Sequence, residues 1–268
     1  MTENVKDNKT KPAKKVQATA EEKATVKRYD WIARWTHTFH AIAMLVLLFT
    51  GFAIYFRWDF ITFHNARAWH MIAVPVLIVT NWILVPYGIM AEGYAEGGVK
   101  GIVSHFKSAY IFGKDDFLRL KGMILNFFGK QAEYPPFTVY DKKTGHYVTK
   151  LHPMFKILIV LEGMCIFLIF ITGIVLYKVD WSVLGLPIAE WITWIFNWIG
   201  QWFNMNGLEL IRWVHLALTY FFVFELIVHV FILEFDPKVF KYWKSIFING
   251  QEDLDGPVVE VVENAHHK

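Results

Sequence analysis

Four histidines lie inside apolar stretches of the chain, where an ionisable side chain is costly and by default indicates function. They are His37, His70, His215 and His229. His215 and His229 are 14 residues apart, so in one α-helix their imidazoles share nearly the same face, about 21 Å apart along the axis. One helix therefore offers two ligands at two depths, and His37 and His70 are the expected partners. Such a set fits the axial ligands of two stacked b-type haems.

The elements that must position these histidines are membrane-spanning helices. Of the 268 residues, 55% are hydrophobic and 18% are aromatic, which is more apolar than an ordinary soluble domain. Charges and prolines divide the sequence into four apolar stretches of about the 20 residues that cross a hydrocarbon core. The expected spans are residues 35–56, 67–90, 153–177 and 210–235. We therefore predict an all-α integral membrane protein, built as a four-transmembrane-helix bundle.

A fifth apolar stretch, residues 181–203, is nearly long enough to cross a membrane. It contains Pro187 and Glu190, and its tryptophans at positions 191, 194, 198 and 202 recur at helical spacing along one face. Tryptophan is enriched at the membrane–water boundary, and a helix with an aromatic face can lie in that plane. We interpret the stretch as an extra interfacial helix between spans 3 and 4, in preference to a fifth span.

The distribution of basic residues predicts the orientation, because lysine and arginine favour the cytoplasmic side of short loops. The segment before the first span, the long central loop and the C-terminal end together hold twenty-three of them, against four on the opposite face. Both termini are therefore expected in the cytoplasm, which requires an even number of spans. The N-terminal segment lacks the apolar core and cleavage site of a secretory signal.

Depth along the four spans pairs the histidines. His37 starts the first span and His229 ends the fourth, so both are expected at the cytoplasmic level. His70 and His215 start the second and fourth spans and share the outer level. His40 competes with His37 for its role, and His64 competes less well with His70. Ligation by two histidines saturates an iron, so such a site transfers electrons and leaves no position for a substrate.

Other polar residues of the spans have two interpretations each. Cys165 is the one cysteine, so no thiolate cluster can form and histidine must hold any iron. Glu225 precedes His229 by one helical turn; it could relay protons or satisfy a hydrogen bond, and Glu162 is the weaker candidate. The arginines three residues before proposed ligands either pair with haem propionates or anchor the membrane boundary: Arg34, Arg67 and Arg212.

Several short motifs resemble the cytochrome b (gamma) subunit of membrane-bound formate dehydrogenases and its relatives in nickel–iron hydrogenases. The first span has Arg34-Trp-Thr-His37 and then Thr50-Gly51, and the second opens with Arg67-Ala-Trp-His70. The third has Leu151-His-Pro-Met-Phe-Lys156 before Thr172-Gly173, similar to a Tyr-Asn-Pro-x-Gln-Lys stretch in that family. The fourth has two histidines at the family's spacing. The resemblance covers residues 28–244. In the first span, the number of residues between the histidine and Gly51 resembles the family's when the histidine is His37, and this favours His37 over His40.

The resemblance implies a dihaem cytochrome b domain over residues 28–244, with haem ligand pairs His70/His215 and His37/His229. A basic disordered cytoplasmic tail, residues 1–27, would precede it, and a cytoplasmic tail, residues 245–268, would follow. Electrons would pass from an iron–sulfur subunit and its catalytic dehydrogenase on the outer face to menaquinone or ubiquinone near the cytoplasmic haem. His152 stands where the family has asparagine; it is either a quinone contact or a boundary histidine at a helix start.

The expected function is thus to anchor a formate dehydrogenase and transfer its electrons to quinone across the inner membrane of a bacterium or archaeon. The chain would not be catalytic alone. Alternatives are the cytochrome b subunit of a nickel–iron hydrogenase or of a thiosulfate-type reductase, or a haem-free transporter or scaffold. No P-loop, dinucleotide fingerprint or nucleophile motif is found, and no nucleic-acid partner is expected. Higher-order oligomers, the partner enzyme and the quinone are left open.

Overall fold

The computed structural model describes residues 25–131, 135–136, 138–234, 241–256 and 259–263. Four helical segments in them are long and apolar enough to cross a membrane, beginning at Trp31, Phe63, Pro153 and Gly207. This confirms the all-α membrane bundle. The helices are α1 Trp31–Phe56, α2 Phe63–Val79, α3 Val85–Tyr110, α4 Lys114–Phe127, α5 Pro153–Tyr177, α6 Ile188–Gly200, α7 Gly207–Glu234 and α8 Lys241–Lys244, with π turns η1 Thr80–Leu84 and η3 Ser245–Asn249 and a 3₁₀ turn η2 Gln201–Phe203.

Capping residues fix where the spans begin. Asp30 accepts a hydrogen bond from the Ala33 backbone N at 2.7 Å at the start of α1, and Thr62 accepts one from Asn65 N at 3.2 Å at the start of α2. Proline occupies the first position of α5, where its missing N–H costs nothing. The third span coincides with the predicted residues 153–177, whereas the end of the fourth expected span, residue 235, lies outside the described residues.

The second span is longer than predicted. From α2 the helix passes through the π turn η1 into α3, so it continues beyond residue 90. The helical path changes direction at Gly97 and Gly98, where Gly98 has the left-handed φ of 60°. The two arms then approach so closely that a Cβ on Gly101 would lie 1.9 Å from the Gly93 carbonyl oxygen. Glycine at both positions makes this crossing possible.

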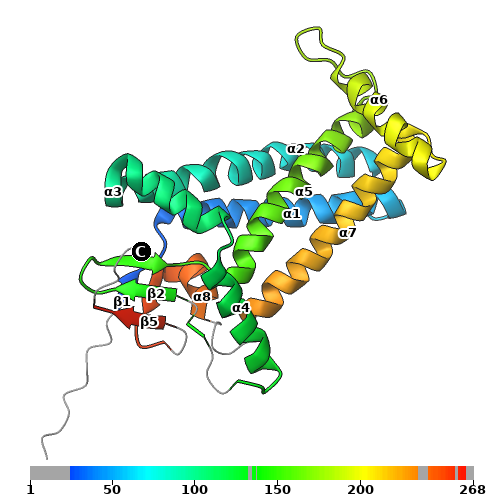
Figure 1. The fold of residues 1–268 in the computed structure, drawn as a ribbon. Coiled ribbons are helices and arrows are strands. Elements are labelled where there is room, and N and C mark those ends of the chain that lie inside the picture. Colours follow the sequence, from blue (N-terminus) through cyan, green and yellow to red (C-terminus); the bar gives the residue numbers. More distant parts are fainter. Residues whose placement is uncertain (1–24, 132–134, 137, 235–240, 257–258, 264–268) are drawn as a thin grey trace, which may run out of the picture.

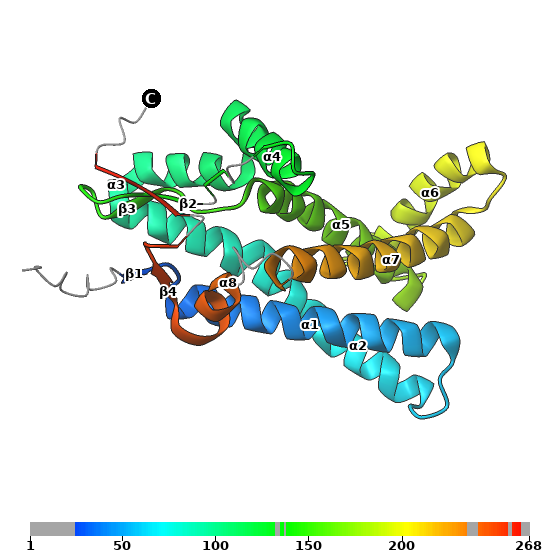
Figure 2. The same ribbon diagram turned by 90° about the horizontal axis from the view of Figure 1, so that it is seen from below.

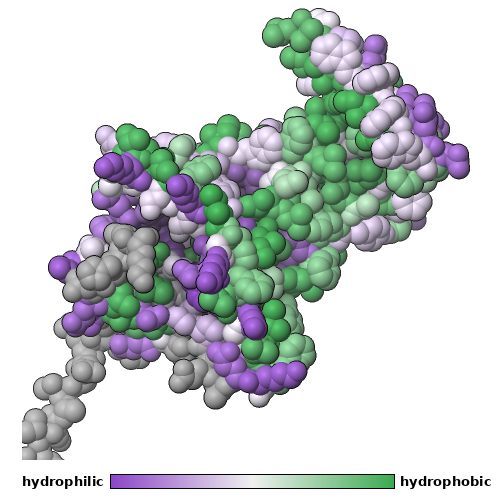
Figure 3. Space-filling view, in the orientation of Figure 1, coloured by the Kyte–Doolittle hydropathy of each residue, from purple (hydrophilic) through white to green (hydrophobic). Residues whose placement is uncertain are grey.

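The bundle consists mainly of two helix pairs, α1 with α2 and α5 with α7 (Figures 1 and 2). Between the pairs lies a small apolar core of Ala43, Met44, Leu77, Ile166 and Phe222. Many large apolar side chains of the spans are exposed, and Figure 3 shows apolar side chains over α5 and α7 between hydrophilic ones toward the ends. A surface of this kind suits lipid as its surroundings.

The helix α6 has 13 residues, which makes it about 20 Å long and too short for a hydrocarbon core of about 30 Å. It packs on α7 and α5, and Trp191, Trp194 and Trp198 are exposed on it. Its place at one end of the bundle (Figure 1) agrees with the predicted interfacial helix between spans 3 and 4.

Short strands form a cap at the opposite end of the bundle (Figures 1 and 2). Strands β1 and β4 pair antiparallel, and β2 pairs antiparallel with β3 and parallel with β5. We call these strands, α8 and η3 the cap. The strands and η3 belong to segments that the sequence assigned to the tails and the central loop, whereas α8 lies at the end of the predicted 28–244 domain. Residues 1–24 of the first tail lie outside the described residues. The strands are β1 Thr25–Lys27, β2 Thr138–Asp141, β3 His146–Thr149, β4 Gln251–Asp253 and β5 Val259–Val262.

Candidate haem sites

The four histidines fall at two levels of the bundle. His37, near the start of α1, and His229, near the end of α7, meet at the cap end with 6.2 Å between ring centroids. A histidine nitrogen binds a transition metal at about 2 Å, so two imidazoles on opposite sides of one metal ion have centroids roughly 6 Å apart. The observed separation therefore leaves room for one iron between the rings.

Aromatic rings enclose the cap-end pair. Phe155 of α5 stacks on the His229 ring with 5.0 Å between centroids, and Phe247 of η3 meets the His37 ring edge-on at 5.1 Å. His37 Nδ1 is buried with no hydrogen-bond partner in the described part of the chain. Glu225 Oε1 lies 3.8 Å from His229 Nδ1. These rings cover part of the two imidazoles, and Glu225 lies beside one of them.

At the far end, a threonine fixes the proton position of each imidazole. Thr50 Oγ1 lies 2.9 Å from His70 Nδ1, and Thr172 Oγ1 lies 3.0 Å from His215 Nδ1. Each hydroxyl already donates to a carbonyl of its own helix, Val46 O at 2.6 Å in one case and Leu168 O at 2.9 Å in the other. Each therefore accepts from Nδ1–H, which leaves the Nε2 lone pair free for a metal.

The glycines that follow these threonines give the imidazoles space. A Cβ on Gly51 would lie 3.6 Å from His70 Cε1, and a Cβ on Gly173 would lie 3.4 Å from His215 Cε1. Both Thr-Gly pairs therefore support a histidine from a neighbouring helix as well as bonding back to their own. The structure thus shows that a histidine side chain occupies the space beside each glycine.

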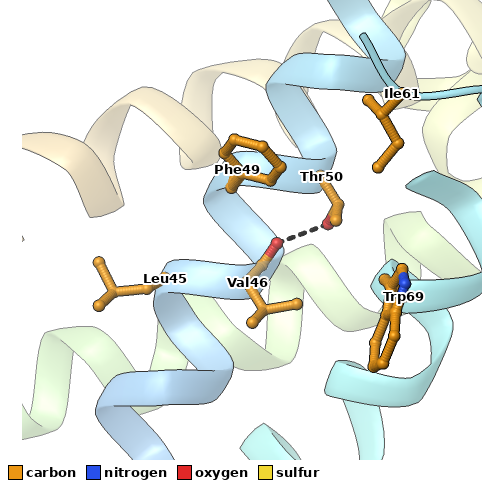
Figure 4. A pocket seen from close by; sticks show the side chains of 6 residues that line it. All are labelled: Leu45, Val46, Phe49, Thr50, Ile61 and Trp69. Atoms are coloured by element: carbon orange, nitrogen blue, oxygen red, sulfur yellow. Dashed lines mark hydrogen bonds between the residues drawn. The ribbon is translucent and has the colours of Figure 1, made fainter. Parts of the chain in front are cut away.

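An apolar hollow lies beside Thr50 on the surface of α1 and α2. Its volume is about 370 Å³, and Figure 4 shows the side chains that line it around the Thr50–Val46 hydrogen bond. The lining residues are Leu45, Val46, Phe49, Thr50, Ile61 and Trp69. Apart from the Thr50 hydroxyl and the indole N–H of Trp69, the lining side chains are apolar.

The three arginines near the proposed ligands have different surroundings. Arg34 donates through Nη2 to the carbonyls of Phe247 and Ile248, and so ties α1 to η3. Arg67 donates to the Tyr177 carbonyl at 3.3 Å and lies over the Tyr177 ring, whereas Arg212 is exposed. Pairing of these residues with propionates stays a prediction.

His152 caps the start of α5 and is buried. Its Nδ1 accepts from Met154 N at 3.0 Å, so in the neutral ring Nε2 carries the proton. Burial, and then the charge of Arg119, lower the pKa of His152 to about 3. The ring is therefore neutral at physiological pH and acts as a hydrogen-bond donor.

A charged cluster next to His152 was missed by sequence reasoning. Asp116 of α4 binds Lys156 of α5 at 2.8 Å and Arg119 at 2.6 Å. Arg119 Nη1 is buried without a partner among the described residues. The signal in the sequence was two acidic residues at the start of an amphipathic stretch, but nothing there indicates that α4 folds back on α5.

The competing histidines have surroundings different from those of His37 and His70. His40 contacts Glu162, with 2.8 Å between Nε2 and Oε1. His64, expected outside the helix, lies in the first turn of α2 and is exposed. The described residues contain no group of three or more histidine, cysteine or acidic side chains that could hold a free metal ion. Two histidines at each level fit haem iron, which needs two axial protein ligands.

Comparison with known proteins gives one informative relative. The chain is 58% identical over 240 residues to the F420 non-reducing hydrogenase II cytochrome subunit of Methanosarcina mazei, and the match covers 89% of this chain and 87% of the relative. No family model matches the chain, and no solved structure matches it.

Proposed function

The chain belongs to the family of hydrogenase cytochrome subunits, and from this premise we propose that it carries electrons from a hydrogenase through the membrane on two b-type haems. A cytochrome subunit carries haem, which argues against the haem-free transporter or scaffold. The relative's name also favours the hydrogenase alternative over the formate dehydrogenase expected first, for which the comparison gives no support. The catalytic partner is then a hydrogenase.

The observation that carries the proposal is the arrangement of four imidazoles as two pairs at the two ends of one bundle. His37 and His229 have the centroid separation of a shared metal ion. The proton positions of His70 and His215 leave Nε2 of both rings free for a metal. When bound, each haem would supply one-electron redox chemistry; the protein contributes the positions of the imidazoles, their tautomers and the aromatic rings beside them.

We place the cap end in the cytoplasm on the basis of its basic residues. Electrons from an iron–sulfur subunit of the hydrogenase then enter at His70 and His215 and leave at His37 and His229. The acceptor is a lipid-soluble carrier that takes two electrons and two protons, for which menaquinone or ubiquinone remains the specific prediction. His152, a buried donor beside the Phe155–His229 stack, is the residue proposed to bind its polar ring.

The test is a reduced-minus-oxidised visible spectrum of the purified chain with a pyridine haemochrome count. Two haems per chain are expected, and His215→Ala and His229→Ala should each remove one. His64→Ala is the matched control, because it deletes an exposed histidine of the same bundle and should leave both haems. A folded protein without haem, or one that keeps both haems in either ligand variant, refutes the ligand scheme.

A further inference from the structure

A polar cluster inside the bundle has no part in the ligand scheme. His40 of α1, Thr80 of η1 and Glu162 of α5 meet there: His40 Nδ1 is 3.3 Å from Thr80 Oγ1, and His40 Nε2 is 2.8 Å from Glu162 Oε1. Thr80 is 3% exposed. An ionisable pair at membrane depth is expensive to keep and therefore indicates a function.

The hydrogen bonds of this cluster account for its protons. Thr80 donates to the carbonyls of Val76 and Leu77 at 2.8 and 3.0 Å, so it accepts from His40 Nδ1–H. With a proton on Nδ1, a neutral His40 has only a lone pair at Nε2. Two lone pairs at 2.8 Å would repel, so the contact with the Glu162 oxygen requires one further proton between Nε2 and Oε1. That proton makes either an imidazolium beside a carboxylate or a neutral imidazole beside a carboxylic acid. The pair thus holds one transferable proton.

The backbone of the second span is irregular at this cluster. Thr80 opens the π turn η1, which widens the helix over residues 80–84. Single π turns within α-helices occur frequently at functional sites. The following residue, Asn81, also faces α5, since a Cβ on Gly163 would lie 3.9 Å from Asn81 Oδ1. Two polar side chains of the π turn therefore lie against α1 and α5 around the His40–Glu162 pair.

Titratable groups surround the pair from the neighbouring helices. His40 interacts electrostatically with both cap-end imidazoles, His37 and His229. Glu162 interacts with Glu225 and His229 of α7, and with Cys165 on its own helix. Charges in this apolar interior are weakly screened. A change of charge at the cap-end pair is therefore felt at His40 and Glu162.

We propose that the His40–Glu162 pair is a proton-loading site coupled to the electron that a haem bound between His37 and His229 would hold, an inference that rests on the proposed function. For each electron that arrives between His37 and His229, the pair, which already shares one proton between Nε2 and Oε1, takes a second proton from water at the cap end and becomes an imidazolium beside a carboxylic acid. When the electron passes to the lipid-soluble carrier, the pair gives that proton to the carrier. Charge and atoms balance, because the carrier consumes protons and electrons in equal number.

The experiment is a redox titration of both haems in the purified full chain between about pH 6 and pH 8. The haem missing from His229→Ala identifies the cap-end site. Its midpoint potential should fall as pH rises in the wild type, and this shift should be lost in Glu162→Gln and His40→Gln. The far-end haem should give the same titration in all three proteins.

Cys165→Ser is the matched control, because it replaces the other titratable side chain of α5 near Glu162 and should keep the pH shift. A cap-end potential that is independent of pH in the wild type, or equally dependent on pH in Glu162→Gln, overturns the proposal. Should Glu162→Gln fail to assemble, reduced-minus-oxidised infrared spectra of the wild type decide: a carboxyl band sensitive to heavy water is expected, and its absence overturns the inference. A wild type without haem refutes the proposed function instead.

Discussion

At the scale of residues, a threonine hydroxyl fixes each far-end imidazole. Thr50→Val keeps the shape of the buried side chain but removes the acceptor of His70 Nδ1–H. Loss of a hydrogen bond to the second nitrogen of a ligating histidine typically weakens metal binding by about 10- to 100-fold. We therefore expect the far-end haem to be lost first during dilution. Haem retention, followed by visible spectroscopy, measures this. Thr50→Ser restores the hydroxyl and should behave as wild type; equal retention in Thr50→Val contradicts the role.

His152 gives a prediction on acid stability. An imidazole in the unfolded chain takes up a proton near its ordinary pKa of 6.5, whereas the folded chain does so only near pH 3. The stability from His152 is therefore complete above about pH 6.5 and declines by about 1.4 kcal/mol per pH unit below it. His152→Asn keeps an acceptor for Met154 N but does not titrate. The thermal unfolding midpoint of His152→Asn should fall less than that of the wild type between about pH 7 and pH 5. An equal fall in the two proteins would refute the role of His152 in acid stability.

At the scale of elements, the crossing of the two arms of α3 depends on glycine. Gly101→Ala would put a methyl group 1.9 Å from the Gly93 carbonyl oxygen, so the arms must separate. Overpacking of this kind costs about 1–3 kcal/mol, and thermal unfolding should show the loss. Gly88→Ala is the control on the same helix, since a Cβ there meets nothing within 4 Å. If both variants unfold at the same temperature, the close crossing does not contribute to stability.

The sequence predicted the elements whose pattern is local. Hydropathy located the spans, and the third coincides with the predicted range because Pro153 and the residues after Tyr177 interrupt an otherwise apolar run. The π turn at Thr80 and the return of α4 onto α5 were not predicted, because both depend on contacts between distant segments. The same holds for the site. Depth along the spans suggested which histidines pair, but only the fold shows that His40 faces Glu162.

At the scale of the whole molecule, a buried ion pair holds the cap together. Arg28 donates to Glu252 Oε2 at 2.6 Å and lies over the Tyr242 ring, with 1% of its side chain exposed. Arg28→Met leaves the Glu252 carboxylate buried without its cation, which typically costs about 3–5 kcal/mol. Hydrogen exchange of β1 and β4 should become faster while both haems are retained.

Lys27→Met is the control for the cap, because Lys27 is the exposed neighbour of Arg28 on the same strand end. Its exchange rates should match those of the wild type. Unchanged exchange in Arg28→Met would show that the helices alone hold the cap in place.

The pairing of β1 with β4 joins Thr25–Lys27 to Gln251–Asp253, almost the full length of the described chain. During synthesis β1 can pair only after β4 has left the ribosome, and all four spans are made in between. Closure of so long a loop is slow compared with helix formation. The pairing of β1 with β4 is therefore expected to form after the four helices, so the two ends of the chain join last.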